Sequence, residues 1–135
     1  MKNESLTGSL VLVHPDFKDD PVQRQGQVGV MTYPRELNEM YVSFPGGGEG
    51  VYSWDTLLKL KDKQDIVRNL TSNGSAMPEN DFKALYKIML LMDRGTSLGT
   101  LSALEMARDN PSVWERALDP VRQIERLDAH KSYGR

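Results

Sequence analysis

Short β-rich runs, separated by glycines and a polar loop, most strongly constrain what the first sixty residues can fold into. Four such runs occupy residues 9–13, 26–32, 40–44 and 51–54. Alternation in the third run places Met40, Val42 and Phe44 on one face, and Tyr41 and Ser43 on the other. Short alternating runs with glycine turns are typical of small barrels, so we predict a compact all-β unit here.

The connections between these runs carry their own signals. We predict a hairpin connection at residues 33–39 and a second one at 45–50, where four glycines supply positive φ at little steric cost. A short turn at 55–57 is expected to drop Leu57 into the core. A final extended segment at 58–61 then closes the unit.

From residue 62 the apolar spacing changes to a helical period. We predict a short helix that begins at 62 or 64 and ends at 73, a helix over 78–94, and a helix that Ser97 caps and that ends at 110. The spacing of the second helix predicts a buried stripe made of Phe82, Leu85, Tyr86, Met89 and Met92.

The end of the chain is also predicted to be helical. Ser112 and Glu115 have the spacing of a capping box, and Pro120 is expected to kink or restart the helix. We therefore predict an α+β protein: an N-terminal β-barrel over residues 1–61, a short helix and linker over 62–77, and a helical segment over 78–135. The total is three to four short helices.

Composition narrows the functional classes. The 135 residues are 27% charged and 39% hydrophobic, which is typical of a globular protein of one domain or two very small ones. Without cysteine the chain has no disulfide, thiol catalysis or common zinc cluster. No apolar run is long enough to span a bilayer, and no apolar leader follows Met1, so we expect a cytoplasmic protein.

Charge is unevenly spread along the chain. Residues 1–57 hold four basic and eight acidic side chains, a net charge of −4, whereas the whole chain is −2 and the remainder therefore +2. Nucleic-acid binding depends on neutralising phosphates with Lys and Arg. The acidic half therefore favours a basic or neutral peptide as its partner.

Small and apolar residues in a fixed order carry a family resemblance. The order is Gly8-x-Leu10-Val11-x-Val13, Gly26-x-Val28-Gly29-x-Met31, Tyr41-Val42-x-Phe44, Gly46 to Gly48, and Leu57. It resembles the Src-homology-3-type (SH3-like) small barrels, whose layout Tudor, KOW and mind-bomb-type modules share. The resemblance covers about the first 60 residues and implies a barrel whose loops bind a peptide or protein partner.

Aromatic residues of this half have two interpretations. Phe17, Tyr33, Tyr41, Tyr52 and Trp54 lie near several acidic residues, an arrangement that can hold an ammonium group by cation–π attraction. The favoured interpretation is that Tyr52 and Trp54 fill the core, because aromatic side chains supply large buried area. Four residues are predicted to contact a partner: Phe17, Asp19, Tyr33 and Tyr41.

Catalytic and metal-binding patterns are weak. The Gly-rich segment at 45–50 lacks the Lys-Ser/Thr ending of a nucleotide loop, so a hairpin turn is favoured over a phosphate cradle. His14 near Asp16 matches no established ligand spacing. We predict no enzyme activity, no cofactor and no metal site.

A nucleic-acid-associated regulator is the main alternative. Helix, turn and helix follow one another after residue 97, in the half with a net charge of +2, although the second helix presents a mixed rather than a basic face. Its phosphate contacts would be Arg94, Arg108, Arg116 and Arg122. We favour a non-catalytic adaptor that binds a protein or peptide through two barrel loops, the one at residues 15–20 and the Gly-rich turn at residues 45–50. A homo-oligomer is compatible with either function.

Overall fold

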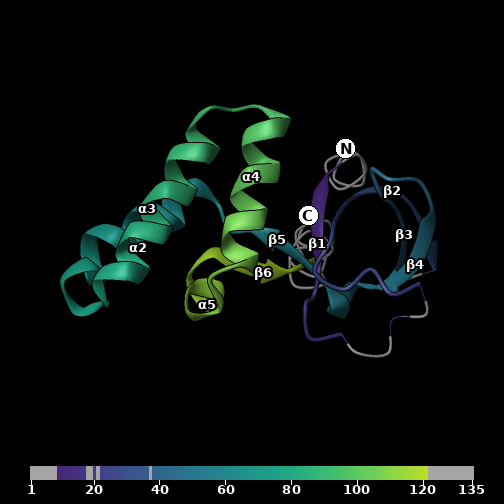
Figure 1. Ribbon diagram of the computed structural model, residues 1–135, viewed down its shortest axis with the longest axis horizontal. Coiled ribbons are helices and arrows are strands. Elements are labelled where there is room, and N and C mark those ends of the chain that lie inside the picture. The colour runs from purple at the N-terminus through teal and green to yellow at the C-terminus, as the bar shows by residue number, and fades with distance from the viewer. Residues whose placement is uncertain (1–8, 18–19, 21, 37, 122–135) are drawn as a thin grey trace, which may run out of the picture. The chain divides into compact units, whose positions relative to one another are not determined.

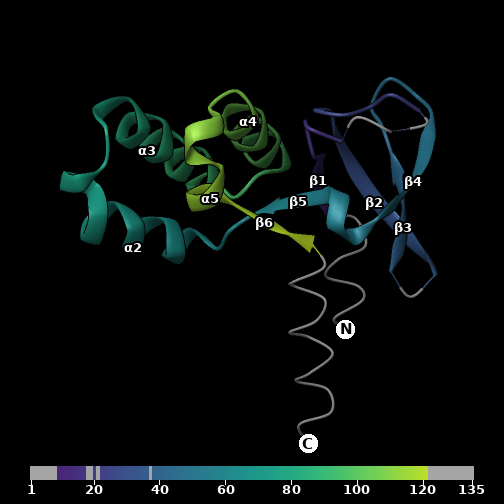
Figure 2. The same cartoon turned by 90° about the horizontal axis from the view of Figure 1, so that it is seen from below.

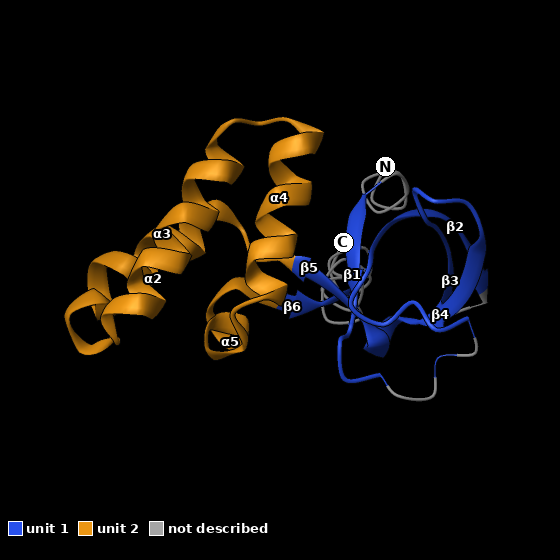
Figure 3. Ribbon diagram, in the orientation of Figure 1, with its two compact units in different colours: residues 1–59, 119–135 blue, residues 60–118 orange. Residues whose placement is uncertain are grey.

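The computed structural model describes residues 9–17, 20, 22–36 and 38–121. The chain divides into two compact units, which Figure 3 colours separately. The strand unit comprises residues 1–59 and 119–135, and the helical unit comprises residues 60–118. The predicted α+β class is confirmed: the described residues form a six-stranded sheet and four α-helices.

Strands of the sheet lie in the order β4-β3-β2-β1-β5-β6 (Figure 1). Their bounds are β1 Leu10–Val13, β2 Val28–Glu36, β3 Glu39–Ser43, β4 Glu49–Ser53, β5 Leu57–Leu60 and β6 Leu118–Pro120. A single 3₁₀ turn, Trp54–Thr56, separates β4 from β5. The ladders β1–β2, β2–β3, β3–β4 and β1–β5 are antiparallel, so β1 to β4 form a continuous meander and β5 returns to the far side of β1.

Alternation along the strands builds the core of the strand unit, as the sequence predicts. Met40, Val42 and Phe44 are almost fully buried, and so are Tyr52 and Trp54. They form one cluster with buried side chains from the other strands and from the segment after β6: Val11, Val13, Met31, Leu57 and Val121. The interpretation of Tyr52 and Trp54 as core residues is therefore confirmed.

The predicted hairpin connection at residues 33–39 is wrong, because β2 continues to Glu36. Figure 2 shows β2 and β3 running together as a long pair. Tyr33 pairs with Tyr41 and Pro34 with Met40, and the register shifts on either side of this segment. Such irregularities allow a strand to hold a proline, which has no N–H to donate to the ladder. The second predicted connection is correct: Gly47 and Gly48 have φ of 95° and 92° in the turn before β4.

Four helices make up most of the helical unit. They are α2 Lys63–Asn73, α3 Glu79–Asp93, α4 Ser97–Arg108 and the short α5 Trp114–Ala117. Helix α3 contacts both α2 and α4. The close approach of α4 to α3 requires Gly99, because a Cβ there would lie 2.5 Å from the carbonyl oxygen of Leu91.

Three details of the predicted helices are wrong. Thr96, not Ser97, is the N-cap of α4, and its Oγ1 accepts a hydrogen bond from the Gly99 N–H at 3.0 Å. The capping box does not form, because the Ser112 hydroxyl instead donates to a carboxylate oxygen of Asp81 at 2.6 Å. The buried face of α3 is also displaced from the predicted stripe: Ala84, Leu85 and Ile88 are buried, and Tyr86 is 46% exposed.

The helical prediction for the end of the chain is confirmed only in part: α5 forms after Ser112, residues 118–120 are a strand rather than helix, and residues 122–135 lie outside the described residues. After α5 the chain becomes extended, and β6 ends at Pro120, at the edge of the sheet, where a proline is tolerated. The two compact units meet at residues 59/60 and 118/119, so α2 lies in the same unit as α3 and α4, and residues 119–121 lie in the unit of the strands.

Candidate functional site

The long loop between β1 and β2 is held by a buried carboxylate. Asp20 is only 5% exposed. One of its oxygens accepts the Val22 N–H at 2.9 Å, and the other accepts the Arg24 N–H at 2.8 Å and the Tyr52 hydroxyl at 2.9 Å. Burial, the hydrogen bond to Asp20 and the negative charge of Asp20 together raise the pKa of Tyr52. Asp20 therefore fixes the loop to β4.

Arg24 joins the same loop to the Gly-rich turn between β3 and β4. Its guanidinium donates to the carbonyl oxygen of Gly47 at 3.0 Å and to Gln27 at 3.1 Å. The Cζ atom lies 5.1 Å from the centre of the Phe44 ring, within cation–π distance. The two loops that the sequence predicts as the binding site are therefore neighbours, but their polar groups bond to each other.

The predicted partner-binding residues fall into separate places. Phe17 is half-buried and packs against the core, with its ring 6.3 Å from the Tyr52 ring in an edge-to-face arrangement. Asp19 lies outside the described residues. Tyr33 and Tyr41 lie on the opposite face of the sheet, because Tyr41 alternates with the buried Met40 and Val42 along β3. The structure thus groups Tyr33 with Tyr41 but not with Phe17.

Tyr33 and Tyr41 form an aromatic pair on this outer face. They are cross-strand partners, their ring centres are 4.9 Å apart, and Tyr33 is 54% exposed. Tyr41 is also the cross-strand partner of the half-buried Val51 on β4, so an apolar row crosses three strands. At one side of the row Arg35 bonds to Glu39 at 3.3 Å. We call Tyr33, Tyr41 and Val51 the tyrosine row.

Two members of this neighbourhood are absent from the sequence-based prediction. Val51 and Arg35 lie beside the predicted tyrosines only because β2 extends past Tyr33 and β4 pairs with β3. The signal available in the sequence was the period of two in Tyr33-Pro34-Arg35, which places both side chains on one face of a strand. Pro34 concealed it.

Of the four arginines predicted to contact phosphates in the alternative function, Arg108 and Arg116 bond to other side chains of the protein. Arg108 pairs with the adjacent Asp109 at 2.9 Å, and this hydrogen bond raises its pKa further. Arg116 donates to the side-chain oxygen of Asn69 at 2.6 Å. Arg94 is exposed at the end of α3. Arg122 lies outside the described residues.

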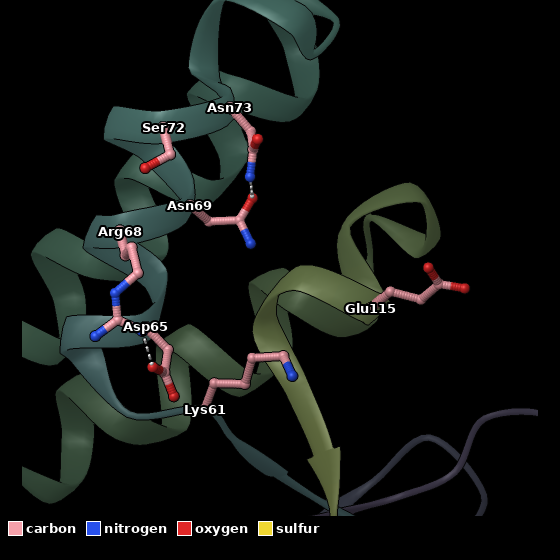
Figure 4. A pocket seen from close by; sticks show the side chains of 7 residues that line it. All are labelled: Lys61, Asp65, Arg68, Asn69, Ser72, Asn73 and Glu115. Carbon is pink, nitrogen blue, oxygen red and sulfur yellow. Dashed lines mark hydrogen bonds and ion pairs between the residues drawn. The ribbon is translucent and has the colours of Figure 1, made fainter.

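A polar pocket of about 340 Å³ opens in the helical unit (Figure 4). Its lining comes from α2, from α5 and from the connection between β5 and α2: Lys61, Asp65, Arg68, Asn69, Ser72, Asn73 and Glu115. Arg68 bonds to Asp65 at 2.9 Å, and Asn73 donates to Asn69 at 3.4 Å. The two basic and two acidic lining residues balance, so the lining does not favour a phosphate group.

Among the residues that the structure describes, no three His, Asp or Glu side chains gather in a way that could hold a metal ion. No described helix is both long and apolar enough to cross a membrane. Comparison with protein-family models, with curated proteins and with solved structures found no match to this chain.

Proposed function

We propose that residues 8–60 form an SH3-like small barrel. The support is topological: a four-strand meander is followed by one 3₁₀ turn and a fifth strand that pairs with the first. The long second strand carries register shifts, as a strand does when it bends to serve two parts of a curled sheet. The buried cluster inside the meander fits such a closed unit.

We further propose that the protein is a non-catalytic adaptor that binds a protein or peptide partner, with the tyrosine row as the contact surface. The pair of the exposed Tyr33 and the half-buried Tyr41 carries this proposal. Tyrosines supply large contact area at a low cost in side-chain entropy, and they are enriched among the residues that dominate binding energy. Two paired strands hold both rings, so little ordering is needed when a partner binds.

The loops contribute less in this proposal than the sequence suggests. Asp20 and Arg24 form hydrogen bonds with other groups of the strand unit, and Phe17 packs against the core of that unit. Their role is to hold the β1–β2 loop and the Gly-rich turn in place. A partner contact at this end would fall on exposed side chains such as Val22, which is 41% exposed.

A peptide library displayed on phage tests this function. Peptides selected on the full chain are synthesised with a fluorescent label, and their affinities for the wild type, Tyr33→Ala and Tyr41→Ala are measured by fluorescence anisotropy. We expect each substitution to weaken binding at least about tenfold, because truncation of a central hot-spot tyrosine costs about 2 kcal/mol or more, and about 1.4 kcal/mol corresponds to a factor of ten. Leu98→Ala, a 70% exposed apolar side chain of the helical unit that lies in neither proposed surface, is the control and keeps full affinity.

Two results would contradict the proposal. Either the selected peptides bind Tyr33→Ala and Tyr41→Ala as well as the wild type, or selection yields no peptide while the chain is retained on heparin at low salt. Retention that falls steeply as salt rises would indicate phosphate contacts and favour the nucleic-acid alternative. Circular dichroism of both variants shows whether a loss of binding reflects a loss of fold.

A further inference from the structure

Helix α3 has an apolar surface that its own unit does not cover. Tyr86 and Leu90 are each 46% exposed, whereas Leu85 and Ile88 on the other side of the helix are fully buried. Residues four apart are neighbours on a helix surface, so Tyr86 and Leu90 lie one above the other. The Phe82 ring stacks on Tyr86 with centres 6.3 Å apart and extends this surface by one turn.

We call Phe82, Tyr86 and Leu90 the α3 stripe. Basic side chains border this stripe on one flank. With 3.6 residues per turn, Lys83, Lys87 and Arg94 fall on the same side of Leu90, and all three are exposed. Lys83 forms an ion pair with Glu79, with 3.0 Å between the lysine Nζ and the carboxylate Oε2. On the other flank the carboxylate of Asp93 is neutralised by Lys63 of α2. The stripe therefore has basic side chains along one side, and on the other side the charge of Asp93 is neutralised by its ion pair with Lys63.

We propose that this face of α3 docks an acidic amphipathic helix of a partner protein. Apolar residues of such a helix, at a spacing of three and four, would cover Tyr86 and Leu90, and carboxylates along one edge would meet Lys83, Lys87 and Arg94. The inference goes beyond the proposed function, because it assigns a second surface, in the helical unit, to a partner segment of defined character, an acidic amphipathic helix.

Charge argues for this occupant over a second copy of the chain. In a symmetric antiparallel pair of α3 helices the basic flank of one copy would face the basic flank of the other, which places Lys83 against Arg94. Like charges at an interface disfavour association. A nucleic acid would use the basic residues but would leave Tyr86 and Leu90 without an apolar partner.

A pair of designed peptides tests the proposal. Both are amphipathic helices with the same leucine face, and one polar edge carries glutamates in the first peptide and lysines in the second. Fluorescence anisotropy with the full chain is expected to show at least about tenfold tighter binding of the glutamate peptide. Lys87→Glu should weaken the glutamate peptide and strengthen the lysine peptide, whereas Leu90→Ala should weaken both.

The exposed Leu98 on α4 provides the matched control. It is 70% exposed, so Leu98→Ala should fold normally and bind the glutamate peptide like the wild type. Equal affinity for the two peptides, or binding of neither, would overturn the proposal. So would binding of duplex DNA or of anionic phosphatidylglycerol vesicles that Lys87→Glu abolishes and Leu90→Ala leaves unchanged. Tyr33→Ala should not alter peptide binding here, which separates this result from that of the tyrosine row.

Discussion

At the scale of single residues, Asp20 is the most consequential side chain of the strand unit. It is a buried carboxylate with three hydrogen-bond donors: two backbone N–H groups and the Tyr52 hydroxyl. Tyr52→Phe removes one donor and leaves the carboxylate buried. A hydrogen bond to a charged group contributes about 2 kcal/mol, so we expect the free energy of unfolding in urea to fall by about that amount.

Tyr33→Phe is the control for this prediction. Its ring is 54% exposed, so loss of its hydroxyl leaves no buried group without a partner, and the free energy of unfolding should change by less than about 0.5 kcal/mol. Equal losses in the two variants would show that the buried carboxylate does not depend on Tyr52.

The same hydroxyl makes stability depend on pH. The pKa of Tyr52 is raised in the folded state above the ordinary tyrosine value of about 10. The folded protein therefore keeps the phenol proton at a pH where the unfolded chain releases it, and this group's contribution to stability is complete below pH ~10 and declines above it. Urea denaturation from pH 8 to 11 should show a steeper decline for the wild type than for Tyr52→Phe.

The burial of Asp20 could not be predicted from the sequence. Asp16 and Asp20 both stand in one polar loop, and nothing local distinguishes the exposed Asp16 from the buried Asp20. The difference arises from Tyr52, more than thirty residues away, which reaches Asp20 only once β4 is in place. Alternation, by contrast, is local, and it correctly predicted that Met40 and Val42 face the core and Tyr41 does not.

At the scale of elements, the start of α4 offers a clean comparison of two adjacent residues. Thr96 caps the helix through its side chain, whereas Ser97 is already its first residue. Thr96→Ala should lower the free energy of unfolding by about 1 kcal/mol, the typical cost of a lost N-cap. Ser97→Ala should leave it nearly unchanged, since alanine is a good helix former.

Thermal and urea denaturation of the two variants show which residue, Thr96 or Ser97, caps α4. A larger loss in Ser97→Ala than in Thr96→Ala would mean that the helix begins one residue later, as the sequence alone suggests. The ambiguity is physical: both residues carry a hydroxyl that can cap, and only the backbone geometry of the preceding Gly95 turn, with φ of 70°, selects between them.

Helices and strands were predictable to the extent that their spacing was undisturbed. The three long helices are present close to their predicted ends, because glycine, proline and capping residues mark them. The failures lie where a local signal opposes the tertiary context: Pro34 inside β2, and the residues after α5 that form β6. A strand at the sheet edge, only three residues long, has no period to detect.

At the scale of the whole molecule, the candidate surfaces follow from strand pairing and helix orientation. Tyr33 and Tyr41 were predicted individually, but their contact depends on the extension of β2 to Glu36. Tyr86 was predicted to be buried because its spacing fits a stripe, and it is exposed because α3 turns Ala84 and Ile88 toward its neighbours instead. Small residues such as Ala84 mark close helix contacts that a count of large apolar residues overlooks.

Division into two units makes a final prediction about cooperativity. Each unit buries its own core and contains one tryptophan: Trp54 is buried among strands, and Trp114 donates from its indole to the Ala107 carbonyl oxygen. Single-tryptophan variants, Trp114→Phe and Trp54→Phe, let fluorescence follow the strand unit and the helical unit separately. Since domains with separate cores can unfold separately, we expect core truncations to act mainly on their own unit.

Leu85→Ala and Met31→Ala are the matched truncations, because both side chains are fully buried, one in α3 and one in β2. Each should cost about 2–5 kcal/mol. Leu85→Ala should lower the urea midpoint reported by Trp114 and leave that of Trp54 nearly in place, and Met31→Ala should do the reverse. If both midpoints instead fall together in both variants, the chain unfolds as one cooperative body, and the β5 and β6 segments that carry the chain between the units couple the two cores.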